Sequence, residues 1–247
     1  MKKTLTYVIM AAAIMTFALW EEIEPMIFGS PTINVDLTPR WDAVAAWPGV
    51  EVDTASADPE PGRTTTVLVF DDSGSMSRRI NAAKIAALDF AGKLPETTHI
   101  GAIGLNSGVL VEPMPVDDAL PVLTSALGGV IADGGTPLSR ALRQAHNMLR
   151  LEAANQRGFG NYQILVTTDG EADNPSLLTD EVVAILRNSP VNIATIGIGI
   201  GDGHPLNLGG ETRYVAISDV ADLASALEDV SAEQTQFDPV TAFEETN

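Results

Sequence analysis

The sequence predicts an α/β domain built on a mostly parallel central β-sheet, and three observations lead to this fold class. The unbroken apolar run Val67–Phe70 is typical of a strand that is covered on both faces, as strands of parallel sheets are. Similar runs alternate with helical patterns along the rest of the chain. The first run then ends in the polar segment Asp71–Ser75, at the position where open α/β sheets bind ligands.

The same alternation predicts the elements in chain order. A turn signal at residues 106–108 precedes Val109–Glu112, which we expect to be a short antiparallel edge strand. Pro137 suits the first turn of a helix. Parallel strands are expected at Thr65–Phe70, His99–Leu105, Tyr162–Thr167, Val191–Ile198 and Arg213–Ile217. Helices are expected at Arg78–Leu94, Val116–Leu127, Pro137–Glu152, Ser176–Asn188 and Val220–Val230.

Residues 1–20 carry an export or membrane signal, expected to form a hydrophobic helix ahead of the domain. Lys2 and Lys3 precede a run of 16 uncharged residues from Leu5 to Trp20, which as a helix reaches about 24 Å against a hydrocarbon core of about 30 Å. An uncleaved anchor and a signal peptide cleaved after Thr16-Phe17-Ala18 therefore both stay open. The positive-inside rule places the domain outside the cytoplasm, either anchored to the inner membrane on its periplasmic side or secreted.

Residues 21–63 are expected to form an acidic linker, because six prolines forbid a long helix there. Within it, apolar residues alternate with polar ones over residues 33–37, and Trp41 and Trp47 follow. These residues are either a docking segment for a partner or a short strand and turn packed on the domain, and we favour the second interpretation. Residues 233–247 are expected to be an acidic, polar tail.

The charge and cysteine content exclude several classes of protein. A net charge of −19, from 14 basic and 33 acidic residues, argues against nucleic-acid binding, because phosphate contacts need a basic surface. The same charge attracts cations. Because the chain has no Cys, it has no disulfide framework, thiolate metal site or thiol nucleophile.

The polar segment after the first strand has the donors of a hard metal ion. Asp71, Ser73 and Ser75 alternate along a tight turn, so their side chains could converge on one cation. Oxygen donors of this kind favour Mg²⁺, Mn²⁺ or Ca²⁺ over soft metals. The alternative is a polar turn in which Asp71 or Ser73 caps the following helix.

Two distant segments complete a recognisable pattern. Thr136 lies in Gly-Gly-Thr-Pro-Leu before a helix, and Asp169 lies in Thr-Asp-Gly after an apolar strand. Asp71-x-Ser73-x-Ser75, then Thr136, then Asp169, in that order, resembles the metal-ion-dependent adhesion site of the von Willebrand factor type A domain. The resemblance covers about residues 64–232 and implies that family's Rossmann-like three-layer fold.

The resemblance implies a role for each of these five residues. Ser73 and Ser75 would ligate the cation directly, Thr136 would do so directly or through water, and Asp71 and Asp169 would act mostly through water. One coordination position would stay open for an Asp or Glu of a partner protein. Mg²⁺ is the expected ion, with Ca²⁺ or Mn²⁺ as alternatives, since Mg²⁺ keeps waters while binding few protein groups.

Four further acidic residues lie near these positions. Asp72 stands where we expect an uncharged residue in many relatives; it is either a solvated or capping residue, which we favour, or an extra counter-charge. Asp133, Glu171 and Asp173 crowd the same face. So much negative charge could shift the preference toward Ca²⁺, which accepts more oxygen ligands.

Three classes of function follow. The first, which we favour, is an exported or membrane-anchored module that binds a carboxylate of a partner protein through the cation. The second is a structural or assembly subunit of an envelope or pilus complex whose metal site mainly stabilises its fold. The third is a metal-assisted hydrolase, which would need a poised general base, for which Asp169 could be proposed. The resemblance argues against catalysis, and we expect no enzymatic activity.

Overall fold

A computed structural model describes residues 35–52 and 58–235 of the chain. The predicted hydrophobic helix over residues 1–20, the first part of the linker and the end of the tail therefore lie outside the described residues. Within the described ranges, no helix is both long and apolar enough to span a bilayer.

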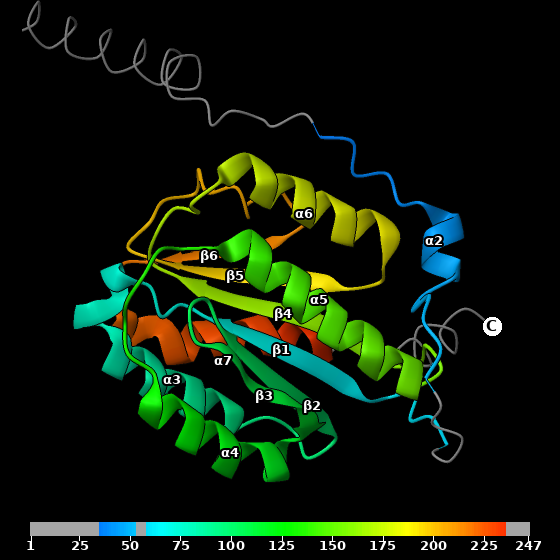
Figure 1. The fold of residues 1–247 in the computed structure, drawn as a ribbon, viewed down its shortest axis with the longest axis horizontal. Helices are drawn as coiled ribbons and strands as arrows, with labels where there is room; N and C mark the ends of the chain where they lie inside the picture. Colours follow the sequence, from blue (N-terminus) through cyan, green and yellow to red (C-terminus); the bar gives the residue numbers. More distant parts are fainter. Residues whose placement is uncertain (1–34, 53–57, 236–247) are drawn as a thin grey trace, which may run out of the picture. The chain divides into compact units, whose positions relative to one another are not determined.

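The centre of the domain is a six-stranded sheet in the order β3-β2-β1-β4-β5-β6 (Figure 1). All neighbouring strands pair in parallel except β2 and β3, which are antiparallel. The predicted fold class is therefore confirmed. The strands are β1 (Thr64–Phe70), β2 (Thr98–Gly104), β3 (Gly108–Pro115), β4 (Asn161–Thr168), β5 (Asn192–Ile198) and β6 (Arg213–Ile217).

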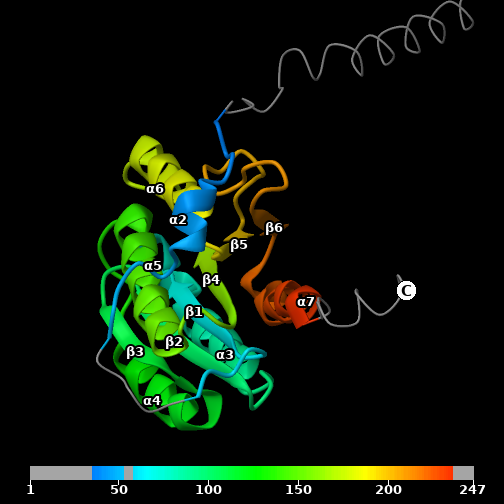
Figure 2. The same cartoon turned by 90° about the vertical axis from the view of Figure 1, so that its right-hand side faces the viewer.

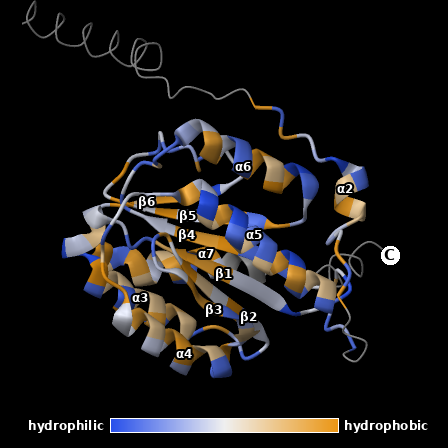
Figure 3. Cartoon of the chain, in the orientation of Figure 1, coloured by the Kyte–Doolittle hydropathy of each residue, from blue (hydrophilic) through white to orange (hydrophobic). Residues whose placement is uncertain are grey.

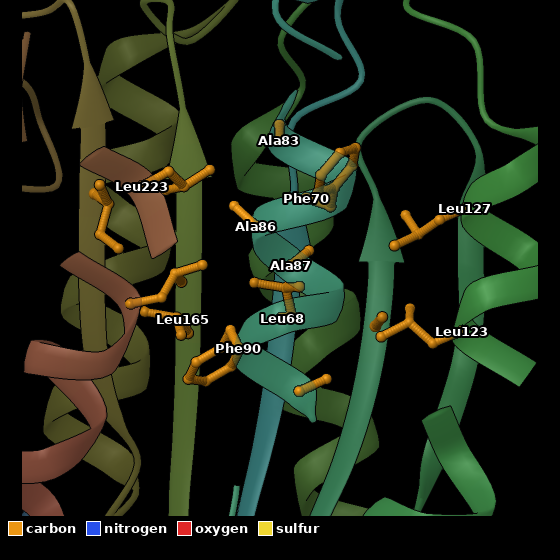
Figure 4. Close-up of a cluster of buried hydrophobic side chains, with 14 of the residues drawn as sticks. Leu68, Phe70, Ala83, Ala86, Ala87, Phe90, Leu123, Leu127, Leu165 and Leu223 are labelled. Atoms are coloured by element: carbon orange, nitrogen blue, oxygen red, sulfur yellow. The ribbon is translucent and has the colours of Figure 1, made fainter. Parts of the chain in front are cut away.

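Helices cover both faces of the sheet (Figure 2). Leu68 and Phe70 of β1 face the layer of α3, α4 and α7, whereas Val67 and Val69 face the layer of α5 and α6. Figure 4 shows the first of these two cores, and Figure 3 shows apolar strands between helices of mixed polarity. The helices are α2 (Trp41–Ala45), α3 (Ile80–Ala91), α4 (Val116–Gly129), α5 (Leu138–Asn155), α6 (Pro175–Asn188) and α7 (Leu223–Thr235).

Three elements differ from the prediction. The helix expected from Arg78 begins instead as the 3₁₀ turn η1 (Gly74–Arg78) and continues as α3, and η2 (Val220–Asp222) similarly precedes α7. Strand β3 runs on to Pro115 instead of ending at Glu112. Proline lacks an N–H but is tolerated in a strand at the edge of a sheet, so the prolines after Glu112 do not end the pairing.

The segment that contains Trp41 and Trp47 packs on the domain, as we favoured. It does so as the helix α2 followed by a turn, and not as a strand. The backbone N–H of Arg40 donates to the carbonyl oxygen of Arg187, at the end of α6, at 2.7 Å. The Trp47 ring stacks on His146 of α5 with centroids 5.3 Å apart, and meets Tyr162 of β4 edge-on at 6.1 Å. Trp41 is 71% exposed.

These contacts predict unequal roles for the two tryptophans. We expect Trp47→Ala to lower the free energy of unfolding by about 2–3 kcal/mol, because it removes a half-buried ring from two aromatic contacts. Trp41→Ala, the matched control, should change it by less than about 0.5 kcal/mol. Urea unfolding of both variants checks this prediction, and equal losses would contradict it.

The stacked imidazole predicts a pH dependence. Burial, with a smaller contribution from the Arg150 charge, lowers the pKa of His146 from 6.5 to about 4. As the pH falls below about 6.5 the unfolded chain takes up this proton first, so stability declines until the pH reaches about 4. We expect the wild type to lose about 2 kcal/mol more than His146→Phe between pH 7.5 and 4.5, allowing for partial exposure. Equal losses in urea titrations would contradict this assignment.

Candidate metal centre

Two adjacent strands bring the predicted carboxylates together. Strands β1 and β4 pair in parallel with Phe70 beside Thr167, so the residues that follow them emerge at the same edge of the sheet. Asp71 accepts hydrogen bonds on both carboxylate oxygens. Oδ1 receives the N–H of Ser73 at 2.8 Å. Oδ2 receives the Thr168 hydroxyl at 2.7 Å and the N–H of Asp169 at 3.2 Å.

Asp71 therefore joins the two loops from inside. Its side chain is fully buried, and this burial raises its pKa, while the hydrogen bonds from Ser73 and Thr168 act in the opposite direction. A buried carboxylate with these donors is a positioning group, because all of its hydrogen bonds fix the backbone and side chains of the two loops.

The two serines lie side by side in the turn that follows. Their Oγ atoms are 2.9 Å apart, and Ser75 Oγ donates to Asp169 Oδ1 at 2.6 Å. Ser73 is buried and Ser75 is exposed, so the pair opens to solvent on one side. Ser73 occupies the N-cap position of η1 without a side-chain cap hydrogen bond, which leaves its hydroxyl for the serine pair.

A third loop delivers Thr136 to the same place. A Cβ atom built on Gly170 would lie 3.5 Å from Thr136 Oγ1 and 3.7 Å from Ser75 Oγ, so both hydroxyls surround one point. Asp173 fixes this loop: its Oδ1 accepts the Thr136 N–H at 2.8 Å, and its own N–H donates to the Thr136 carbonyl oxygen at 3.1 Å. A Cβ at Gly135 would come within 2.8 Å of the Asp173 carboxylate, so this close approach needs glycine.

The donor set fits a hard divalent cation. Within the described ranges, no cluster of three or more His, Cys, Asp or Glu side chains is placed to hold a metal, so a cation here would depend on hydroxyl oxygens. Ser73, Ser75 and Asp169 form one hydrogen-bonded chain, and Thr136 lies beside it. Hydroxyl and carboxylate oxygens are donors that Mg²⁺, Mn²⁺ and Ca²⁺ accept.

Arg79 is a charged residue of this centre that the sequence analysis missed. Its Nη1 donates to Asp169 Oδ2 at 2.8 Å, and the Asp169 side chain is fully buried whereas that of Arg79 is 43% exposed. The local signal was an arginine four residues after Ser75. That spacing does not by itself tell whether the side chain points at the site or into solvent.

Asp72 caps a neighbouring turn and is not solvated. Its side chain is fully buried, so the solvated alternative is wrong, and the capping role is exercised on the β2–β3 turn. There it accepts the N–H of Asn106 at 2.7 Å, the N–H of Ser107 at 2.9 Å and the Ser107 hydroxyl. The carboxylate of Asp72 is thus the acceptor for the β2–β3 turn.

Comparisons with known proteins agree with this architecture. The sequence model of the von Willebrand factor type A domain matches residues 66–233. The pilus adhesin SpaC from Lactobacillus rhamnosus GG has a similar structure (TM-score 0.59, 15% identity) over 73% of this chain and 32% of SpaC. Comparison with curated proteins gives no match.

Two further solved structures share the fold. The vWF domain of the type V pili tip protein Mfa5 from Porphyromonas gingivalis matches with a TM-score of 0.56 and 15% identity, over 72% of this chain and 96% of that one. Manganese-loaded TRAP from Plasmodium vivax matches with a TM-score of 0.50 and 17% identity, over 68% and 72%. At these identities the likeness establishes the fold, and the present chain spans about a third of SpaC.

The hydrogen bonds of Asp72 predict a structural role for this residue. We expect Asp72→Ala to lower the free energy of unfolding by about 2–4 kcal/mol, because the N–H groups of Asn106 and Ser107 lose their charged acceptor. Asp72→Asn should cost less, since one amide oxygen still accepts. Glu96→Ala removes an exposed carboxylate and is the matched control. If denaturant unfolding gave Asp72→Ala the same free energy of unfolding as this control, the structural role would be refuted.

Proposed function

The chain belongs to the von Willebrand factor type A family, and we propose that it is an exported or membrane-anchored module that binds partner proteins through a divalent cation. The observation that carries the proposal is the convergence of three loops, which bring the hydroxyls of Ser73, Ser75 and Thr136 next to the carboxylate of Asp169. The family and the geometry support the same site by independent routes.

Each residue has a distinct part in this proposal. Ser73 and Ser75 would hold Mg²⁺ directly, Thr136 would hold it directly or through water, and Asp71 and Asp169 would hold it mainly through water. When bound, the cation would supply an electron-poor position for an Asp or Glu of the partner, because hydroxyl ligands leave its charge largely unneutralised. Asp71 would fix the positions of the two loops without binding the cation directly.

The surroundings of the two carboxylates support binding over catalysis. A metal-assisted hydrolase needs a general base within reach of an activated water. Both Asp71 oxygens accept hydrogen bonds from the two loops. Both Asp169 oxygens are also occupied, by Ser75 and Arg79. These engaged carboxylates are suited to holding a geometry, so we propose that the protein is not an enzyme.

The proposed location is supported by the sequence of residues 1–20 and by the structural neighbours. Residues 1–20 predict export, with the domain on the periplasmic side of the inner membrane or secreted. SpaC is a pilus adhesin and Mfa5 is a pili tip protein, which supports a role at the cell envelope. The TRAP structure contains manganese, which supports the choice of a hard divalent ion for this chain.

The proposal predicts that removing one exposed hydroxyl weakens metal binding without unfolding the domain. We expect Ser75→Ala to reduce Mg²⁺ affinity at least about tenfold in a calorimetric titration, because one direct ligand is lost. In EDTA its unfolding free energy should fall by only about 1 kcal/mol, the value of the lost hydrogen bond to Asp169. Ser77→Ala, an exposed serine of the same turn, is the matched control and should behave as the wild type.

A capture experiment separates the functional classes. The full chain is incubated with envelope extract in Mg²⁺ or in EDTA, and the captured proteins are compared between wild type and Ser75→Ala. Capture that requires both Mg²⁺ and Ser75 supports the binding module. If Mg²⁺ binds and raises the melting temperature, but the same proteins are captured in Mg²⁺ and in EDTA, the chain is instead a structural subunit. A wild type that binds no divalent cation would refute the metal site.

A further inference from the structure

The positively charged guanidinium of Arg79 lies beside the Asp169 carboxylate. Arg79 Nη1 lies 2.8 Å from Asp169 Oδ2, while Ser75 Oγ occupies Oδ1 at 2.6 Å. The Asp169 side chain is fully buried, where an uncompensated carboxylate would be costly. The guanidinium is therefore the cationic partner of this buried carboxylate.

The backbone and the neighbouring loop hold Arg79 in this position. It is the N-cap residue of α3, and its N–H donates to the Met76 carbonyl oxygen at 2.7 Å. A Cβ atom built on Gly199 would lie 3.7 Å from Arg79 Nη2, so the guanidinium lies next to the loop that follows β5. The adjacent Arg78 is exposed.

We propose that Arg79 is a tethered counter-ion that competes with the divalent cation for Asp169. This inference rests on the proposed metal site and specifies how that site is regulated. Without metal, the guanidinium satisfies the buried carboxylate and keeps the three loops assembled. A divalent cation near the serine pair must share Asp169 with Arg79 and is repelled by its charge. Arg79 thus lowers the affinity of the site for the metal and stabilises its metal-free form.

A purely structural ion pair would behave differently from a competing one. If Arg79 only held the loop in place, removing it would lower stability under all conditions and leave metal affinity unchanged or weaker. If Arg79 competes with the metal, removing it lowers stability only when metal is absent, and metal affinity rises. Only the competing role therefore predicts a rise in Mg²⁺ affinity when Arg79 is removed.

The test combines calorimetric titration with MgCl₂ and thermal unfolding of the full chain, in EDTA and in saturating Mg²⁺. We expect Arg79→Gln to bind Mg²⁺ on the order of tenfold more tightly than the wild type, since one like charge is removed from the site. In EDTA its melting temperature should fall by about 3–6 °C, and saturating Mg²⁺ should restore most of that loss. Arg78→Gln removes a neighbouring positive charge and should change the Mg²⁺ affinity less than about twofold.

An unchanged or weaker Mg²⁺ affinity in Arg79→Gln would overturn the inference. In that case, Mg²⁺ binding and EDTA-sensitive capture by the wild type would still support the proposed function. If neither the wild type nor the variant binds Mg²⁺, both the metal site and this inference are refuted. Arg79→Met keeps the apolar stem of the side chain and replaces Arg79→Gln if the latter does not fold.

Discussion

The buried carboxylate of Asp71 is the contact on which the candidate site depends. It accepts hydrogen bonds from the turn after β1 and from the end of β4, so that two loops separated by nearly a hundred residues share one anion. Because adjacent parallel strands end at the same edge, the sheet brings these loops within reach, and Asp71 fixes their final geometry. The positions of both serines and of Asp169 follow from this one group.

Much of the fold could be predicted from the chain because its local patterns agree with one another. The apolar run Val67–Phe70 has side chains on two cores, and a strand buried on both faces needs such a run. The edge strand extends beyond its predicted end because prolines are tolerated in a strand at the edge of a sheet. Helix α2 was missed because so short a helix is stable only through its tertiary contacts, here with α6.

The candidate site likewise contains residues that could be predicted from the sequence and residues that could not. Asp71, Ser73 and Ser75 form a local pattern, and strand adjacency explains why Asp169 joins them. The partners of Arg79 and Asp72 could not be predicted from their neighbours in sequence. Arg79 reaches Asp169 across 90 residues, and Asp72 reaches a turn more than 30 residues away. Such contacts depend on the assembled fold, which the local sequence around each residue does not specify.

The contacts of Trp47 also determine which interactions would first resist a pulling force applied to the N-terminal segment. Trp47 rests on His146 and on Tyr162, near the start of β4, whereas Asp169 follows the end of that strand. Tension applied through residues 35–40 would therefore be borne first by the aromatic stack and by the Arg40–Arg187 hydrogen bond, at the opposite end of the sheet from the hydroxyl cluster.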